Sequence, residues 1–251
     1  MKSGVCARLV GKISTIRRCK NIRDRIFDRE QLSNAIFKRA VLESISSETC
    51  ILDLGCGHRA SFLRSLSPFV RKAYGVDLEI SESIIDDNIH IMQGDAEAIP
   101  LDDSSVDIIT MINVVEHLRD PKKVFLECRR VLRPGGSFFL MTPNKFYPPI
   151  FIGRALPHFI RQWANSIITS TRSEDTFRSY YKANSAKALV HICSLAGLSV
   201  DSIKYLSNHP EYFMFSTLVY RFAVAIELYV IKHEMFRWFR QRIFCHLIKP
   251  E

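Results

Sequence analysis

Apolar residues between positions 45 and 145 form short runs, and each run ends at a polar or glycine-containing turn. The runs lie near residues 51–52, 73–76, 89–92, 108–115 and 138–142. Short apolar strands that alternate with helical segments are typical of a parallel sheet covered on both faces. A strand over 198–205 and a short one near 212–215 would complete the sheet. The pattern predicts an α/β fold with a doubly wound, mostly parallel seven-stranded sheet, helices on both faces, and extra N- and C-terminal helices.

A glycine turn follows the first of these strands. Asp53 lies at the carboxyl end of the strand, and Gly55 and Gly57 allow the backbone to approach a ligand closely. The start of a helix then directs free N–H groups toward that ligand. The spacing Gly55-x-Gly57-x-x-Ala60 also fits a dinucleotide fingerprint, so the turn alone leaves an NAD-linked interpretation open.

Acidic residues end the next two strands. Asp77 follows the second strand, at the separation where a carboxylate can accept hydrogen bonds from ribose hydroxyls. Asp95 follows the third strand. Both the dinucleotide interpretation and other nucleotide-type pockets remain possible at this point.

Five motifs in order decide between these interpretations. They are Asp53-Leu-Gly-Cys-Gly57, Asp77, Gly94-Asp95-Ala96, Val115-Glu-His-Leu118 and Leu132-Arg-Pro-Gly-Gly136. In this order and spacing, residues 45–145 resemble the class I S-adenosylmethionine-dependent methyltransferases with their Rossmann-like fold, and within them the small-molecule and quinone-type group. An NAD-linked enzyme fits less well, because dinucleotide enzymes usually keep an apolar residue at the position of Asp53 and because the chain has no Tyr-x-x-x-Lys pair.

The resemblance implies S-adenosyl-L-methionine as cofactor. Gly55 and Gly57 would hold the backbone against its methionine part. Asp53 would orient the turn or reach the amino group through water. Asp77 would accept hydrogen bonds from both ribose hydroxyls.

The same resemblance assigns the adenine and the ammonium group to later strands. Leu78 would lie against the adenine face, and Asp95 with the N–H of Ala96 would meet the adenine edge. Asn113, at the end of the fourth strand, would offer its backbone carbonyl to the ammonium group.

His117 is the candidate catalytic base. It follows the fourth strand on the side where the cofactor would lie, and an imidazole is suited to remove a proton from an acceptor hydroxyl near neutral pH. The alternative is that His117 caps or packs the following helix. The pair Glu116 and His117 also looks capable of binding a metal, although no metal cluster is evident and we expect no resident metal.

Composition and charge indicate where the protein works. A chain of 251 residues that is 47% apolar can bury a large core, and its seven cysteines without CxxC spacing suggest reduced thiols in the cytoplasm. The first residues lack the apolar run of a signal peptide. Residues 1–29 contain nine Lys or Arg against two Asp and so account for +7 of the formal charge of +9.

The chain divides into three predicted parts. Residues 1–30 form a basic amphipathic arm, residues 31–216 the methyltransferase domain, and residues 217–251 two amphipathic C-terminal helices. Within the domain, the apolar segment 145–180 is predicted to cap the acceptor site. The arm and the C-terminal helices are suited to a membrane surface, or alternatively to packing on the domain or on a second subunit.

These features predict methyl transfer from S-adenosyl-L-methionine to a small-molecule or lipid-linked acceptor, by O-methylation through in-line displacement. Nucleic acid is not expected as a partner, because Asn113-Val-Val-Glu116 stands where methyltransferases of base amino groups have an Asn-Pro-Pro-Tyr type signature. The enzyme is predicted to be cytoplasmic and peripheral at the membrane. The alternative is a non-catalytic, membrane-associated module that retains the fold.

Overall fold

The computed structural model describes residues 2–80, 83–155 and 178–251. The chain forms two compact units. Residues 37–143, 177–204 and 243–251 form one, which we call the sheet unit, and residues 1–36, 144–176 and 205–242 form the other, which we call the helical unit.

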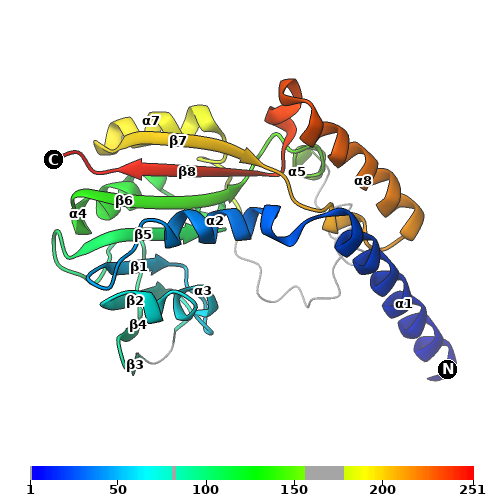
Figure 1. Ribbon diagram of the computed structural model, residues 1–251, viewed down its shortest axis with the longest axis horizontal. Coiled ribbons are helices and arrows are strands. Elements are labelled where there is room, and N and C mark those ends of the chain that lie inside the picture. The colour runs from blue at the N-terminus through cyan, green and yellow to red at the C-terminus, as the bar shows by residue number, and fades with distance from the viewer. Residues whose placement is uncertain (1, 81–82, 156–177) are drawn as a thin grey trace. The chain divides into compact units, whose positions relative to one another are not determined.

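The sheet has eight strands in the order β3-β4-β2-β1-β5-β6-β8-β7 (Figure 1). Their bounds are β1 Cys50–Leu54, β2 Lys72–Asp77, β3 Ile84–Asp86, β4 Ile89–Gln93, β5 Val106–Ile112, β6 Leu132–Pro143, β7 Ser199–Leu206 and β8 Arg242–Ile248. The pairs β1/β2, β1/β5, β2/β4 and β5/β6 are parallel, whereas β3 is antiparallel to β4. Strand β8 is antiparallel to both of its neighbours, β6 and β7 (Figure 1). The predicted α/β fold with a mostly parallel sheet is confirmed, with eight strands where seven were expected.

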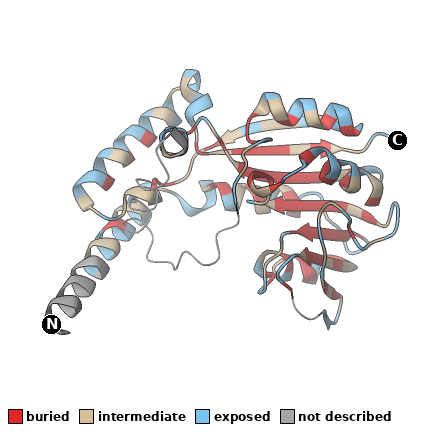
Figure 2. Ribbon diagram, turned by 180° about the vertical axis from the view of Figure 1, so that it is seen from behind, coloured by how far each residue is buried: buried red, intermediate tan, exposed pale blue. Residues whose placement is uncertain are grey.

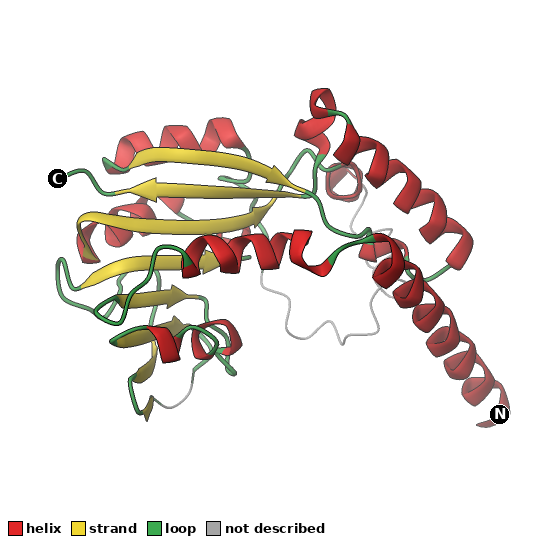
Figure 3. Ribbon diagram, viewed as in Figure 1, coloured by secondary structure: helices red, strands yellow, loops and turns green. Residues whose placement is uncertain are grey.

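Helices cover both faces of this sheet (Figure 3). They are α2 Ser33–Leu42, α3 Ser61–Arg64, α4 Pro121–Val131 and α7 Ala186–Ala196. Successive residues of a strand point to opposite faces, and β6 shows both layers. Phe138 packs edge-on against Phe125 of α4, whereas Phe139 stacks on Phe244, which in turn meets Phe37 of α2. The central strands β1, β5 and β8 are buried along most of their length, whereas the edge strands β3 and β7 are largely exposed or half-buried (Figure 2).

The strand order reverses direction beside β1. From β1 the chain proceeds outward to β2 and β4 on one side, and later to β5 and β6 on the other side. In open α/β sheets, ligands bind outside the carboxyl ends of the strands at such a point. The fold therefore places the candidate site where the loops after β1, β2, β4 and β5 meet.

The second predicted C-terminal helix is wrong. Residues Arg242–Ile248 form the inner strand β8, and Ile243, Phe244 and Leu247 are buried in the sheet. The four-residue spacing of Ile243 and Leu247 predicted a helix, but residues four apart share a face in a strand as well as in a helix. The predicted short strand near 212–215 is also wrong, because Glu211–Phe213 is a 3₁₀ helix.

The helical unit contains α1 Lys2–Ile26, α5 Pro148–Ala155 and α8 Thr217–Lys232, with 3₁₀ helices at Arg29–Gln31 and Glu234–Phe239. The end of α1 packs against α8: Cys19, Tyr220 and Val224 are buried together. Part of the basic N-terminal segment therefore packs on the protein itself. Among the helices that the structure describes, none combines the length and the apolar character that a bilayer span requires. Residues 156–177 of the predicted cap lie outside the described residues.

A substitution at Leu247 tests whether Arg242–Ile248 is a buried strand or a surface helix. Its side chain is fully buried, so Leu247→Ala should lower the free energy of unfolding by about 2–5 kcal/mol through lost burial and a residual cavity. Leu218→Ala provides the matched control, because Leu218 on α8 is 80% exposed and its truncation should change stability by less than about 0.5 kcal/mol. Urea unfolding measures both. Equal, small effects would contradict the placement of Leu247 in the core.

Candidate functional site

The two glycines of the turn after β1 have different reasons to be glycine. Both adopt left-handed backbone conformations, with φ of +75° at Gly55 and +66° at Gly57. A Cβ at Gly55 would come within 2.2 Å of the Cγ2 atom of Val114, so this glycine lets the turn pack against the segment after β5. Apart from its chain neighbours, no atom of the described residues lies within 4 Å of a Cβ position at Gly57. Gly57 therefore borders open space, as a backbone that approaches a ligand would.

Asp77 joins the glycine turn to the end of β2. Its Oδ2 atom accepts a hydrogen bond from the Gly57 N–H at 2.8 Å, and its Oδ1 atom accepts one from the Glu79 N–H at 3.0 Å. A carboxylate has about four acceptor positions, so two such bonds leave room for further donors. The half-buried carboxylate at this place is suited to bind a pair of hydroxyl groups.

Four other predicted residues lie at the same edge of the sheet. Leu78, directly after β2, is 53% exposed, which is unusual for a leucine beside a buried strand. Asp95 is exposed after β4, and its Oδ1 accepts from the Glu97 N–H at 2.9 Å, while Ala96 is half-buried. Asn113 is exposed directly after β5 and adopts the left-handed conformation that Asn tolerates. The chain thus brings Leu78, Asp95, Ala96 and Asn113 to the edge that holds the glycine turn.

Asp53 points into the sheet toward β5. Its carboxylate is buried, and its Oδ1 accepts a hydrogen bond from the Thr110 hydroxyl at 2.7 Å. Burial raises the pKa of Asp53 to about 7, and the nearby Asp77 charge contributes in the same direction, whereas the Thr110 hydrogen bond opposes the rise. Sequence reasoning missed Thr110. The parallel register of β1 and β5, which places these two residues opposite each other, could have indicated it.

His117 lies in a short 3₁₀ helix, Val115–His117, beside a buried acid. Its Nε2 atom is 4.0 Å from Oε1 of Glu116, and its Nδ1 atom is 3.4 Å from the carbonyl oxygen of Arg178 and from the hydroxyl of Ser179. The side chain of His117 is 29% exposed, so it is open to solvent on one side.

A hydrogen-bonded chain holds Glu116. The Thr142 hydroxyl donates to Glu116 Oε2 at 3.1 Å, and the Asn184 amide donates to the Thr142 oxygen at 2.6 Å. The Glu116 carbonyl also accepts from the N–H groups of Tyr180 and Tyr181. Sequence reasoning did not assign Thr142 or Asn184 to the site, because they lie 26 and 68 residues beyond Glu116 along the chain and only the fold brings them together.

The residues at this edge fit a nucleoside sulfonium ligand. Gly57 borders open space, Asp77 retains acceptor capacity, and Leu78 presents an apolar surface. Burial raises the pKa of the Cys56 thiol to about 12, with Asp53 and Asp77 as further causes, so this thiol stays protonated and is not a nucleophile. Within the described part of the chain, no group of three or more His, Cys, Asp or Glu side chains is arranged to hold a metal ion.

Comparison with known proteins places these features in a family. Residues 52–140 match the family model described as a methyltransferase domain. By this match, residues 52–140 form a methyltransferase domain. Such domains use S-adenosyl-L-methionine as methyl donor.

Two curated relatives of the methyltransferase domain are similar over about 100 residues. The uncharacterized methyltransferase YcgJ of Bacillus subtilis is 35% identical over 104 residues, which cover 38% of this chain and 41% of YcgJ. A ubiquinone biosynthesis O-methyltransferase of Coxiella burnetii is 32% identical over 105 residues, which cover 38% of this chain and 44% of that protein. The chain therefore spans less than half of the length of the curated relatives it matches.

Two solved structures share the fold of the methyltransferase domain. The YcgJ protein from Bacillus subtilis superposes with a TM-score of 0.54 at 19% identity, over 86% of this chain and 99% of YcgJ. An S-adenosylmethionine-dependent methyltransferase from Mesorhizobium loti gives a TM-score of 0.59 at 14% identity, over 85% of this chain and 96% of that one. The likeness extends well beyond the residues that match in sequence.

The buried Asp53 predicts a pH dependence of stability. Because its pKa is about 7 in the folded protein and 3.8 in the unfolded chain, the folded state keeps a proton between these values that the unfolded state has lost. Stability should fall as pH rises through this window and then level off above pH 7. Asp53→Asn keeps an oxygen that accepts from Thr110 and removes the effect, so it should be more stable than the wild type at pH 8 by up to about 4 kcal/mol.

Urea unfolding at several pH values between 4 and 8 measures this difference. Asp102→Asn, at an exposed position of the same unit, serves as the control. A difference between Asp53→Asn and wild type that does not change with pH would contradict a buried, protonated Asp53.

Proposed function

We propose that this protein transfers a methyl group from S-adenosyl-L-methionine to the oxygen of a small-molecule or lipid-linked acceptor. One observation supports the proposal above all: the Asp77 carboxylate is bonded to the Gly57 amide at 2.8 Å beside open space. An acid suited to accept hydrogen bonds from ribose hydroxyls and a backbone open to close approach thus lie together at the sheet edge, which supports the proposal.

Eight residues would hold the cofactor. Asp77 accepts from the ribose hydroxyls, and Leu78 lies against the adenine. Asp95 and the Ala96 N–H meet the adenine edge. The remaining four, at the methionine end, are Asp53, Gly55, Gly57 and Asn113.

Asp53 would respond to the charge of the cofactor. The bound cofactor supplies a methyl group on a positively charged sulfur, and its ammonium group adds a second positive charge. Positive charge nearby favours the ionised carboxylate, so cofactor binding would lower the pKa of Asp53 from about 7 and release its proton. An acid that keeps its proton below about pH 7 in the free protein would thus become a counter-ion in the complex.

His117 would act as the general base for the acceptor hydroxyl. A donor at Nδ1 that bonds to the Arg178 carbonyl leaves the lone pair on Nε2. Glu116 Oε1, 4.0 Å from Nε2, stabilises the imidazolium that forms when the proton arrives. The acceptor oxygen then attacks the methyl carbon in line with the departing sulfur. The name of the Coxiella burnetii relative, an O-methyltransferase, is consistent with oxygen as the acceptor.

The cytoplasmic protein would bind peripherally to an anionic membrane through α8. Four residues on one side of this helix are exposed apolar groups: Leu218 (80%), Phe222 (70%), Ile226 (50%) and Tyr229 (55%). Cationic side chains and an interfacial tryptophan accompany them, since Arg221 and Lys232 belong to the same helix and Arg237 lies over the ring of Trp238. Apolar residues with a basic flank and a tryptophan are typical of helices that lie in the headgroup region.

This exposed face also favours the second candidate function, a non-catalytic, membrane-associated module that retains the methyltransferase fold. The two candidates differ in turnover. A binding module would hold S-adenosyl-L-methionine without releasing S-adenosylhomocysteine in the presence of any acceptor.

Calorimetric titration tests the cofactor site. S-adenosyl-L-methionine should bind with micromolar affinity and NAD should not bind. Asp77→Asn keeps an oxygen for the Gly57 amide but loses the charged acceptor, so its affinity should fall at least about tenfold, as expected for hydrogen bonds to a charged group. Asp102→Asn is the control. Unchanged affinity in Asp77→Asn would exclude this carboxylate from the cofactor site.

Turnover of cofactor with a labelled methyl group tests the base. With a quinol and lipid extract as acceptor source, His117→Gln should reduce turnover by about 10²–10⁴ while cofactor affinity stays unchanged. Full turnover in this variant would show that His117 only packs the helix that follows. Cofactor binding by the wild type without turnover would instead favour the non-catalytic module.

Co-sedimentation of the full chain with vesicles tests the membrane surface. The protein should sediment with vesicles that contain phosphatidylserine, less so at high salt, and the double variant Leu218→Gln/Phe222→Gln should remain in the supernatant. The matched control is Val190→Gln/Leu195→Gln, at exposed apolar positions of α7 (46% and 49%). Sedimentation of the α8 variant equal to that of the control would contradict the proposal.

A further inference from the structure

We infer that the helical unit contains a binding site of its own, for an uncharged, mainly apolar ligand with a hydroxyl or carbonyl head group. The site shares no residue with the proposed cofactor and catalytic groups, so it does not depend on the proposed function. It rests on a cavity, on polar atoms without partners beside that cavity, and on the balance of charge around it.

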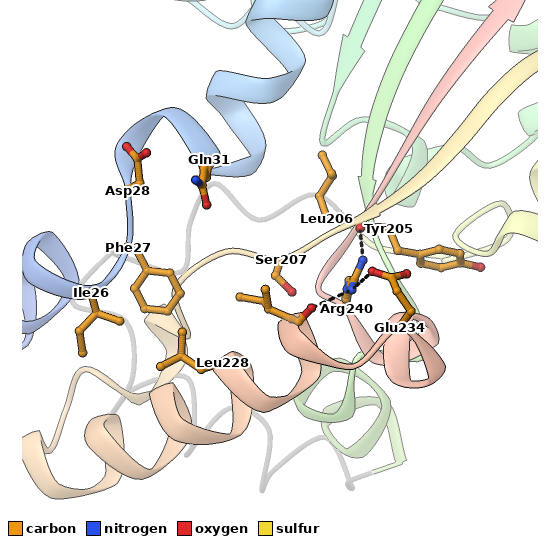
Figure 4. Close-up of a pocket in the computed structure, with 11 residues that line it drawn as sticks. Ile26, Phe27, Asp28, Gln31, Tyr205, Leu206, Ser207, Leu228, Glu234 and Arg240 are labelled. Atoms are coloured by element: carbon orange, nitrogen blue, oxygen red, sulfur yellow. Dashed lines mark hydrogen bonds and ion pairs between the residues drawn. The ribbon is translucent and has the colours of Figure 1, made fainter.

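The cavity has a volume of about 320 Å³, at the lower end of the range of about 300–1,000 Å³ that is common for small-molecule sites. Four segments line it: the connection after α1, the end of β7, α8, and the 3₁₀ helix Glu234–Phe239 with Arg240 behind it. Figure 4 shows Ile26, Phe27 and Leu228 on one side and Tyr205, Glu234 and Arg240 on the other. The cavity is therefore apolar on one side and polar on the other.

Arg240 has one buried hydrogen-bond donor without an acceptor among the described residues. Its Nη1 donates to the Tyr205 carbonyl, and its Nη2 donates to the Ile231 carbonyl and to the Glu234 carboxylate. The Nε–H is buried and has no acceptor among the described residues. A buried donor of this kind is costly unless a water or a ligand oxygen accepts from it.

Two further buried polar groups, Ser207 and Glu227, lie close to Arg240. The Ser207 hydroxyl lines the cavity and is buried beside Glu227, whose carboxylate it reaches as a hydrogen-bond donor. Glu227 on α8 is 4% exposed. Burial raises the pKa of Glu227, while Ser207 and Arg240 close by act in the opposite direction. At the cavity itself, Arg240 Nε offers a donor and the Ser207 oxygen offers an acceptor to a ligand head group.

Buried polar side-chain atoms without a hydrogen-bond partner are concentrated in the helical unit. Of nine buried side-chain N or O atoms without a partner among the described residues, seven belong to residues 207–241. In the sheet unit, the Asp53–Thr110 and Glu116–Thr142–Asn184 contacts satisfy buried polar groups, and Asn184 Oδ1 is the one such atom without a partner among its described residues. Two of these residues, Ser207 and Arg240, line the cavity, and a folded interior usually satisfies its polar atoms, so a ligand oxygen at the cavity would meet this requirement.

The charges around the cavity favour a neutral ligand. Arg240 is paired with Glu234, and Asp28 adds a second carboxylate whose Oδ1 accepts from the Glu30 N–H. An anionic ligand would approach two carboxylates without finding an unpaired cation. A cationic ligand would leave the Arg240 Nε–H unsatisfied. A neutral hydroxyl or carbonyl oxygen accepts from Nε, and the apolar body of the ligand packs on Phe27 and Leu228.

Three probes of one ring size test the site: 1-naphthol, 1-naphthoate and naphthalene. Fluorescence titration of the full chain should show that 1-naphthol binds at least tenfold more tightly than either of the other two. Leu228→Trp fills the apolar side and should abolish binding of all three. Leu218→Trp, the same substitution at an exposed position of the same helix, should leave binding unchanged.

Head-group recognition is tested separately. Arg240→Met removes the Nε donor and should bring the affinity of 1-naphthol down to that of naphthalene. Because loss of the Glu234 pair could unfold this variant, Ser207→Ala serves as a second one, with an expected loss of at least threefold for 1-naphthol and none for naphthalene. A far-UV circular dichroism spectrum and a urea unfolding midpoint equal to those of the wild type verify that each variant is folded.

Three results would overturn the inference. The first is equal affinity for 1-naphthol and naphthalene in the wild type, which would mean that water satisfies the polar atoms. The second is tightest binding of 1-naphthoate, which would identify an anion site. The third is binding that Leu228→Trp leaves intact, which would place the probe elsewhere.

Discussion

The hydrogen bond from the Gly57 amide to the Asp77 carboxylate is the contact on which the functional edge of the sheet depends. It joins the turn after β1 to the end of β2, and the neighbouring Gly55 joins the same turn to Val114 after β5. A side chain at Gly55 would push these two segments apart. The loops of three adjacent strands are therefore held in one arrangement by backbone groups and one carboxylate, and the exposed Leu78 and Asn113 follow from it.

Two buried acids lie behind this edge, and their environments differ. Asp53 has one donor, Thr110, and its raised pKa shows that burial outweighs this hydrogen bond. Glu116 belongs to a longer chain that continues through Thr142 to Asn184 and ends at the carbonyl of Pro143. Buried acids reduce stability, so their retention at the ligand edge of a sheet is a mark of function more than of packing.

Helix α8 illustrates how one element serves two environments. Its inner residues Tyr220 and Val224 pack against Cys19 of α1, which gives the basic N-terminal helix a fixed partner within the helical unit. Its outer residues Leu218 and Phe222 remain exposed. The buried Glu227 stands on the inner side, where an acid has no packing role. The helix thus supplies a core, an exposed apolar face and a polar group beside a cavity.

The sequence by itself determined where the central strands lie along the chain, the α/β class and the residues after each strand. These are local properties, because apolar runs, glycine turns and acids at strand ends are written in consecutive residues. Gly55, Gly57, Asp77, Leu78 and Asn113 all lie where the pattern predicted them, at one edge of a parallel sheet. The roles assigned to them as cofactor contacts remain predictions.

Only the tertiary structure decided which distant groups meet. The spacing of Ile243 and Leu247 fits a helix and a strand equally well. In the folded protein this segment pairs between β6 and β7 as strand β8. The register of β1 and β5 places Thr110 opposite Asp53. Asn184 meets Thr142 only because the chain folds back to the sheet after residue 178, and no local sequence pattern encodes either contact. The cavity beside Arg240 likewise combines residues more than 170 positions apart, from Phe27 to Ser207. Local pattern specifies each element, whereas burial of all elements at once specifies their neighbours.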